Sequence, residues 1–393
     1  MGECFISLEL LEVCINVVLN ALPISGGAQS RRLIVWSEPW YRDSHNNIRV
    51  EELLSRFKLV EPIYQYRSRT GLRGRLRTKF EETKVGKYRN NWAQKRRLGA
   101  LSKRYRLLFC HRDHLRYIQD FDGPVVVDDD DPNFTEKHIE HLNSANVVAV
   151  VTTTELLREQ LIAHGLKKCC HVIPSGVDLS QLEAARSTAK MFAKELGKGP
   201  DDVVVGYTIP AIHLGRGSNV SENTFGLRDT TFLTQVMEQV WGKMPAVQLW
   251  LFGRVNESIK NYATLHPQVR LFGYVPHEQL YRYTVNFDIG VYPRLADFGG
   301  RFSIKLLEFM ASGCPIVSTS VSESFLVSDS GGAMLADDVS TFSECIIQLA
   351  SNPEMRRDLG QRGLEYAQGY DWNRLTERYE AEVFTPCLKT LST

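Results

Sequence analysis

The stretch from Arg301 to Ser320, RFSIKLLEFMASGCPIVSTS, most constrains what this chain can fold into. It predicts a short helix with both ends marked, followed by a buried strand. Ser303 can cap the helix, because its hydroxyl accepts from first-turn N–H groups. Apolar residues recur at i, i+3 and i+7 from Ile304, which is one helical face. Gly313 suits a left-handed residue after the helix, and Pro315 prevents its continuation before a β-branched strand begins.

Glu308 lies among apolar neighbours in the middle of this expected helix. A carboxylate in such surroundings is rarely left without a partner. Two interpretations remain open from the residues alone. Glu308 either pairs with an arginine of the core, or it binds hydroxyl groups of a ligand that enters at the start of the helix. The second interpretation places Glu308 in an open cleft, outside the core.

Short β-branched runs alternate with helical patterns along the chain, which favours parallel α/β sheets. In the first half we expect strands at 14–22, 107–110, 125–127 and 146–151. The same rhythm starts again with a strand at 203–207, and Asp229 is placed to cap the helix that follows. A Pro-Ser-Gly sequence makes Ser175–Leu179 the expected linker. At 393 residues, the chain is long enough for two domains with separate cores.

The composition is that of an ordinary globular protein, with 43% apolar and 24% charged residues. Eight cysteines are scattered without a C-x-x-C pair, which argues against a zinc site or a disulfide framework and favours a reducing, cytoplasmic setting. No apolar run reaches the roughly 18 residues that a membrane-spanning helix needs. Acidic residues interrupt the apolar N-terminal stretch, which does not fit a signal peptide.

Positive charge is concentrated in one segment. From Arg67 to Arg106 there are 15 Lys and Arg residues against two acids, a net charge of +13, although the whole chain carries only +1. Leu72, Leu76, Phe80 and Trp92 are interleaved with these charges in a helical pattern. A solvated charged face would explain the run, and so would a cationic amphipathic helix that binds an anionic surface. We expect a possible contact with the cytoplasmic face of a membrane.

Two further clusters follow strands of the first half. His111 and His114 come after the strand at 107–110, where either could contact a substrate, although a surface histidine is the simpler interpretation. The run Asp128–Asp131 follows the strand at 125–127. Asp128 and Asp130 could hold Mg²⁺ or Mn²⁺, because hard cations prefer oxygen ligands. We favour a loop or helix-capping role for the run, since Asp is common at helix starts.

The 301–320 stretch resembles the donor-site motif of the family-four glycosyltransferases. Their usual pattern is Glu-x-Phe-Gly-x-x-x-x-Glu, then a small residue, Gly, and Pro-Val-Val. Phe302, Glu308, Gly313 and Pro315 fit this pattern, whereas Ser303 stands at the usual Gly. Gly300 stands at the first Glu, so half of the acidic pair is missing. Sequence similarity to the family extends over about 172–383, including the Val172–Asp178 segment.

The resemblance implies an α/β fold with two Rossmann-like domains facing each other across a cleft, the GT-B fold. We assign residues 1–177 to an acceptor domain, which the crossover helix within 371–393 completes. Residues 178–370 form the donor domain, which binds the nucleotide sugar.

The resemblance also implies roles for single residues. Glu308 accepts the ribose hydroxyls of the donor, and the loop with Gly26 and Gly27 faces its diphosphate. The amides of 302–304 meet the diphosphate at the helix start. Family members use an Arg and a Lys near the first strand of the second domain. The usual spacing is absent here, so Arg216 and Arg228 are the candidates for these cations, and Lys305 is another. With Phe302, Ser303 and Ile304 they form the set of candidate donor contacts. The catalytic candidates are His111, Arg228 and Glu308.

The expected function is therefore transfer of a sugar from a nucleotide sugar, with retention of configuration, as for a hexosyltransferase. The acceptor is expected to be a lipid-linked or anionic glycan, a lipid or another small molecule. No cofactor or metal is expected, and no nucleic acid, because no nucleic-acid-binding module is present. Two alternatives remain: a catalytically impaired GT-B-like binding protein, in view of Gly300, and a metal-dependent GT-A-like transferase that uses Asp128 and Asp130.

Overall fold

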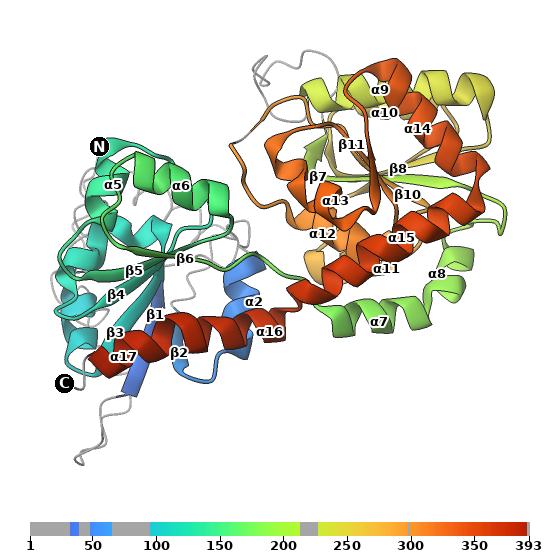
Figure 1. Cartoon of the computed structure of the whole chain (residues 1–393). Coiled ribbons are helices and arrows are strands. Elements are labelled where there is room, and N and C mark those ends of the chain that lie inside the picture. The colour runs from blue at the N-terminus through green and yellow to red at the C-terminus, as the bar shows by residue number, and fades with distance from the viewer. Residues whose placement is uncertain (1–31, 39–47, 65–94, 213–226, 298, 391–393) are drawn as a thin grey trace, which may run out of the picture. The chain divides into compact units, whose positions relative to one another are not determined.

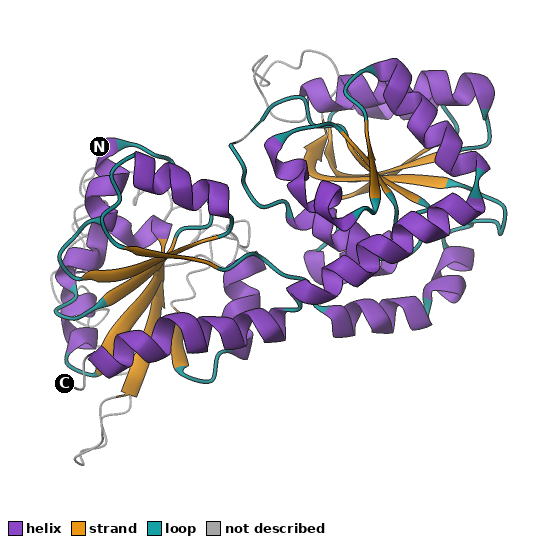
Figure 2. Cartoon of the chain, in the orientation of Figure 1, coloured by secondary structure: helices purple, strands orange, loops and turns teal. Residues whose placement is uncertain are grey.

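The computed structural model describes residues 32–38, 48–64, 95–212, 227–297 and 299–390. Residues from Leu33 to Thr393 cluster as one compact unit that contains two six-stranded sheets. Helices cover both faces of each sheet, as Figure 2 shows. The expected strand at 14–22 lies outside the described residues. The boundary between the two domains remains a prediction, although each sheet has separate hydrophobic clusters on its two faces.

The first sheet has the strand order β2-β1-β3-β4-β5-β6. The strands pair in parallel where β1 meets β2, β3 meets β4, β4 meets β5 and β5 meets β6. Its central strands are β-branched and buried on both faces, as expected for a covered parallel sheet. The strands are β1 (Arg32–Glu38), β2 (Val60–Tyr64), β3 (Tyr105–His111), β4 (Val125–Asp128), β5 (Val147–Thr152) and β6 (Cys169–Val172).

One face of this sheet is covered by α5, α6 and a helix over 95–102, and the other by α2 and the C-terminal helices (Figure 1). Thr154 caps α6 by accepting from the Leu157 N–H at 3.1 Å. Trp372 and Tyr379 fill the second face together with Phe109. The helices are α2 (Ile48–Arg56), a 3₁₀ helix (Arg112–Asp120), α5 (Glu136–Leu142), α6 (Glu155–Ala163), α16 (Trp372–Arg378), a π-helical turn (Tyr379–Phe384) and α17 (Thr385–Thr390).

The second sheet has the order β12-β11-β10-β7-β8-β9, and each neighbouring pair of these strands is parallel. In chain order this is the doubly wound arrangement, which reverses direction between β7 and β10. The strand expected at 203–207 is confirmed, and it is longer than predicted. The strands are β7 (Val204–Ile212), β8 (Gln248–Val255), β9 (Val269–Gly273), β10 (Ile289–Tyr292), β11 (Ile316–Ser318) and β12 (Ala333–Leu335).

Helices α9, α10 and α14 cover one face of the second sheet, and α7, α11, α12 and α13 pack on the other (Figure 1). Close packing requires glycine at Gly206, where an added Cβ would lie 2.1 Å from the Phe287 ring. The helices are α7 (Leu179–Ser187), α8 (Ala189–Glu195), α9 (Leu227–Lys243), α10 (Glu257–Leu265), α11 (His277–Thr284), α12 (Ile304–Ala311), α13 (Phe325–Ser330), α14 (Val339–Ser351) and α15 (Pro353–Ala367), with short 3₁₀ turns at Ser322–Ser324 and Gln368–Tyr370.

Candidate functional site

The strand order of the second sheet reverses between β7 and β10, so a ligand crevice is expected at the carboxyl ends of these two strands. Open α/β sheets bind their ligands at such switch points, because the loops that follow the two strands diverge there. The chain leaves β10 at Tyr292 and enters α12 at Ile304, so the segment between them lies at this edge. The motif singled out in the sequence therefore begins beside the crevice.

Helix α12 has the bounds that the sequence predicted. Gly313 follows it with φ of +73°, a left-handed conformation that suits glycine at the end of a helix. Ser303 occupies the N-cap position, but its side chain makes no capping hydrogen bond, contrary to the expectation. First-turn N–H groups are thus not occupied by the Ser303 hydroxyl. Because such groups and the helix dipole attract negative charge, the start of α12 is suited to an anion.

Glu308 does not lie in an open cleft. It is buried in α12, with 2% of its surface exposed, and the expectation of an exposed carboxylate is wrong. Its side chain pairs with the imidazole Nε2 of His277, at the start of α11. The alternative of an arginine partner is wrong as well, because the cation is a histidine. The role of Glu308 toward a ligand stays a prediction.

The pairing with Glu308 changes the acid–base properties of His277. Burial alone would lower the pKa of the imidazole, but the hydrogen bond and charge of Glu308 outweigh burial and raise the pKa above its ordinary value. The charges of Glu52 and Glu278 act in the same direction. His277 is therefore protonated over a wider pH range than a free histidine.

A second ion pair, which the sequence did not predict, lies where the chain leaves β10. Arg294, two residues after β10, donates from Nη1 to Asp229 Oδ2 at 3.2 Å. Asp229 was predicted to cap α9. It lies in the first turn instead, and its other oxygen accepts from the Leu295 N–H at 3.0 Å. One sequence signal could have identified this cation: Arg294 comes two residues after β10, a strand of the switch point.

The remaining second-half candidates have different surroundings. The Phe302 ring packs against that of Tyr370, with the ring centroids 5.9 Å apart. Ile304 and Lys305 are half-buried at the start of α12. Arg228 lies in the first turn of α9, and its side chain is not among those described. Arg216 lies outside the described residues.

Gly300, which replaces the first glutamate of the motif, has φ of +80°. Residues with a side chain rarely adopt this conformation, so a glutamate could not be introduced here without strain. The Gly300 N–H donates to Ser322 Oγ at 2.6 Å, which ties this backbone to the 3₁₀ turn after β11. The loss of the first acidic residue is thus accompanied by a different local backbone.

In the first half, the Asp128 carboxylate is fully buried against Arg49, with Nε–Oδ2 and Nη2–Oδ1 distances of 3.0 Å. The Tyr379 hydroxyl donates to the same carboxylate. Arg49 also donates to the carbonyls of Ile173 and Pro174, each at 2.8 Å. Asp128 therefore joins α2, β4, the segment after β6 and the C-terminal π-helical turn.

The next two aspartates pair with histidines. Asp129 Oδ2 lies 2.7 Å from His138 Nε2, and burial still raises the pKa of Asp129 despite this partner. Asp130 Oδ1 lies 2.8 Å from His111 Nε2. Burial would raise the pKa of Asp130, but the histidine bond and nearby arginines lower it well below its usual range. His111 is thus a buried partner of Asp130, not the surface histidine considered above.

These contacts replace the loop or helix-capping role expected for the aspartate run, since Thr135 caps α5. Among the described residues, no group of three or more His, Cys, Asp or Glu side chains is arranged to hold a metal ion. The need for a metal in the reaction is a separate question and stays a prediction. Gly26, Gly27 and the 65–94 part of the basic segment lie outside the described residues, as does the expected amphipathic pattern. The His114 side chain is not described. Arg106 lies within β3.

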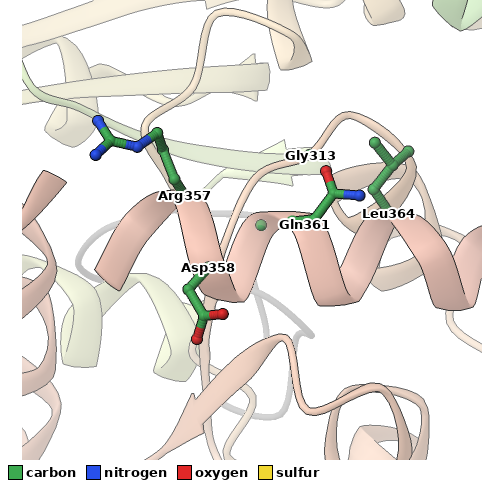
Figure 3. A pocket seen from close by; sticks show the side chains of 6 residues that line it. Gly313, Arg357, Asp358, Gln361 and Leu364 are labelled. Carbon is green, nitrogen blue, oxygen red and sulfur yellow. The ribbon is translucent and has the colours of Figure 1, made fainter. Parts of the chain in front are cut away.

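A shallow hollow of about 500 Å³ lies along α15 (Figure 3). Its lining combines Gly313, at the carboxyl end of α12, with Arg357, Asp358 and Gln361 of α15. The start of α12, which is suited to an anion, is at the opposite end of the helix. An eight-residue helix is about 12 Å long, so the hollow is separate from the crevice at the switch point.

The two parallel sheets and the crevice at the start of α12 define a GT-B fold, and comparison with known proteins confirms the resemblance. Residues 224–352 match the family model described as Glycosyl transferases group 1; the match runs from just before α9 to the end of α14 and does not include β7. No curated protein sequence matches the chain. The GT-A-like alternative is therefore wrong as an assignment of the fold.

Solved structures show the same fold at low sequence identity. Sucrose-phosphate synthase from Thermosynechococcus elongatus superposes with a TM-score of 0.63 and 16% identity, covering 92% of this chain and 100% of that one. Anabaena HepE, solved with UDP and glucose, gives 0.62 and 13%, covering 90% and 100%. The trehalose-6-phosphate synthase OtsA gives 0.60 and 10%, covering 89% and 98%. These similarities establish the fold over most of the chain.

Membrane-spanning helices were sought in the described residues. None of the helices there combines the length and apolar character that crossing a bilayer requires.

Proposed function

We propose that this protein is a glycosyltransferase that moves a sugar from a nucleotide sugar to an acceptor. The observation that carries the proposal is Glu308 in α12, within residues 224–352, which match the group 1 glycosyltransferase model. One carboxylate can accept from two hydroxyl donors, as the ribose of a nucleotide sugar presents. HepE is described in complex with UDP-glucose, which favours a uridine donor as the first to test.

The leaving group of such a reaction is a nucleoside diphosphate, on which negative charge increases in the transition state. The backbone amides of 302–304 and the Lys305 side chain, at the start of α12, would stabilise this charge. Arg294 would add a cation at the same edge, held by Asp229. Fixed amides and cations need little reorganisation during the reaction, and this is the usual source of such stabilisation.

The finer aspects follow from the family-four resemblance. We infer a hexosyltransferase that retains the anomeric configuration, with His111 close to the transferred sugar and Arg228 near the diphosphate. Gly26, Gly27 and Arg216 are proposed donor contacts on the same grounds. The proposed acceptor is a lipid-linked or anionic glycan. The protein would act in the cytoplasm, with the basic segment on a membrane surface.

Gly300 supports a second candidate function. Its left-handed backbone replaces the first acidic residue of the motif, so donor binding could persist without efficient transfer. A panel of UDP-, GDP-, ADP- and TDP-sugars separates the candidates. A ligand that binds the native state raises its melting temperature. Stabilisation together with hydrolysis or transfer supports the enzyme, and stabilisation without turnover supports the binding protein. Absence of stabilisation by every donor would refute both.

We predict that divalent metal is dispensable. The aspartates that could have bound it, Asp128 and Asp130, are paired with Arg49 and His111. Activity of EDTA-treated protein should stay within about twofold of the untreated enzyme, because amides and cations supply the charge stabilisation. Loss of activity in EDTA that Mn²⁺ restores would contradict this prediction.

We predict that the segment 67–106 binds an anionic surface. Its net charge is +13, and each Lys or Arg near an anionic bilayer contributes on the order of 1 kcal/mol. The full chain should therefore sediment with phosphatidylserine-containing vesicles and not with phosphatidylcholine vesicles, and salt should weaken the binding. Equal binding to both vesicles, or none at low salt, would exclude the membrane as the partner.

A further inference from the structure

The contact between His277 and Glu308 is not part of the motif from which the donor site was inferred. His277 is the first residue of α11, and Glu308 lies in the middle of α12. The histidine side chain is 21% exposed and the carboxylate 3% exposed, so the histidine is partly open to solvent while the carboxylate is enclosed. A ligand that touches Glu308 therefore meets a carboxylate that is already hydrogen-bonded on one oxygen, Oε1.

The two helices are held together at both ends. His277 joins Glu308 at the start of α11, and Thr284 Oγ1 lies 2.7 Å from Ser312 Oγ at its end. The Tyr281 ring packs edge-on to the imidazole, with centroids 5.4 Å apart, and limits its rotation. With the ring held, its Nε2 fixes the rotation of the carboxylate. Because a hydrogen bond depends steeply on angle, this orientation matters for any further donor to Glu308.

We propose that His277 is a positioning residue of the donor site: it holds the Glu308 carboxylate in the orientation that ribose hydroxyls require, and its positive charge offsets that of the carboxylate when an anionic donor binds. The inference rests on the proposed function and deepens it. His277 acts through Glu308 and takes no part in the transfer itself. The ligand class is a nucleotide sugar, whose ribose hydroxyls donate and whose diphosphate is negative.

The charges around His277 determine the direction of the effect. The acidic groups that face it are Glu308 on α12, Glu278 on α11, and Glu51 and Glu52 on α2. Tyr281 stays neutral, because burial and Glu308 raise the pKa of its hydroxyl well above the usual value. When His277 loses its proton, the crevice gains a net negative charge. Donor affinity should therefore fall as the pH rises through the pKa of His277.

Isothermal titration calorimetry of the full chain with UDP-glucose, from about pH 6 to pH 9, tests this inference. The diphosphate of a nucleotide sugar is a diester and does not titrate in this range. We expect the wild-type affinity to fall by about three- to tenfold across it, as one uncompensated charge near the diphosphate implies. Near the midpoint, buffers of different ionisation enthalpy should reveal proton uptake on binding, because the donor favours protonated His277.

Two variants separate positioning from general electrostatics. His277→Gln keeps an N–H donor without a charge, so its affinity should be low, independent of pH and without proton uptake. Glu278→Gln removes an exposed neighbouring charge that helps to raise the pKa of His277, so the fall in affinity should keep its size and move to lower pH. A purely structural role for His277 would change the melting temperature of His277→Gln without changing the pH dependence. The proton-uptake measurement needs only the wild-type protein, so poor folding of a variant does not block the test.

The outcomes distinguish this inference from the proposed function. If UDP-glucose and the other donors of the panel fail to bind wild-type protein at every pH, the proposed function fails, and the inference fails with it. If another donor of the panel binds, the titrations use that donor. If a donor binds with an affinity that is independent of pH, or with equal pH dependence in His277→Gln, only the inference is overturned.

Discussion

Replacing Asp128 by asparagine should lower the free energy of unfolding by about 3–5 kcal/mol, the usual cost of leaving a buried charge without its partner. Asp128 and Arg49 are 0% and 1% exposed, and the pair has two well-formed hydrogen bonds. Asparagine keeps the shape of the side chain but not its charge. The guanidinium of Arg49 would remain buried among the carbonyls of Ile173 and Pro174, with the Tyr379 hydroxyl as its remaining polar neighbour.

Urea unfolding followed by tryptophan fluorescence measures this effect, because Trp372 lies in the cluster that the pair borders. The matched control is Glu382→Gln, which breaks a surface pair with Arg378 one turn beyond Tyr379 and should cost less than about 1 kcal/mol. The double variant Arg49→Met with Asp128→Leu should regain part of the loss, since it leaves no buried charge. A cost for Asp128→Asn as small as that of the control would show that the pair contributes little.

The sequence predicted α12 well because its signals are local. A run of apolar residues at helical spacing, a glycine that adopts φ of +73° and a proline that follows lie within a dozen positions of one another. The strand–helix alternation likewise predicted parallel sheets, because a crossover helix is the usual connection between parallel strands. The order of the strands within each sheet required the structure.

The partners of the buried charges could not be predicted, because each is distant in the chain. Arg49 and Asp128 are 79 residues apart, and Asp128 and Tyr379 are 251 apart. For the run of four aspartates, a loop or helix-capping role was favoured over metal binding, because the side chains that face the run are unknown from the sequence. Glu308 illustrates the same limit. Its need for a partner was readable from its apolar neighbours, but neither its burial nor a histidine 31 residues earlier as that partner was identifiable.

Asp229 shows how a local signal can be overruled. An aspartate near a helix start is typically a cap, since its carboxylate accepts from first-turn amides. Here the carboxylate accepts from Arg294 and from the Leu295 N–H instead. A charged donor makes a stronger hydrogen bond than a neutral amide, so the ion pair is favoured over the cap. The same interaction brings to the crevice a cation that no local pattern had indicated.

The second large effect is expected for Glu308→Gln. If the carboxylate accepts the ribose hydroxyls, loss of its charge should weaken donor affinity by about ten- to a hundredfold, because charge-assisted hydrogen bonds contribute roughly 1.5–3 kcal/mol. Binding of UDP-glucose by calorimetry measures this. Glu278→Gln is the control, since it removes an acid of the same region without touching Glu308, and it should bind the donor nearly as the wild type does.

Burial of Glu308 adds an effect on stability, and its pH dependence identifies the cause. The folded-state pKa of His277 is raised, so the pair stabilises the fold fully below the pKa of an unfolded histidine, about 6.5, and less as the pH rises through the folded value. Glu308→Gln should therefore lower the free energy of unfolding by about 1.5–3 kcal/mol near pH 6 and by less near pH 9. A loss of stability that is equal at both pH values, with donor affinity intact, would make α12 a packing element and place the donor site elsewhere. Lost affinity with the expected pH-dependent cost would mean that one carboxylate both secures α11 against α12 and receives the ribose.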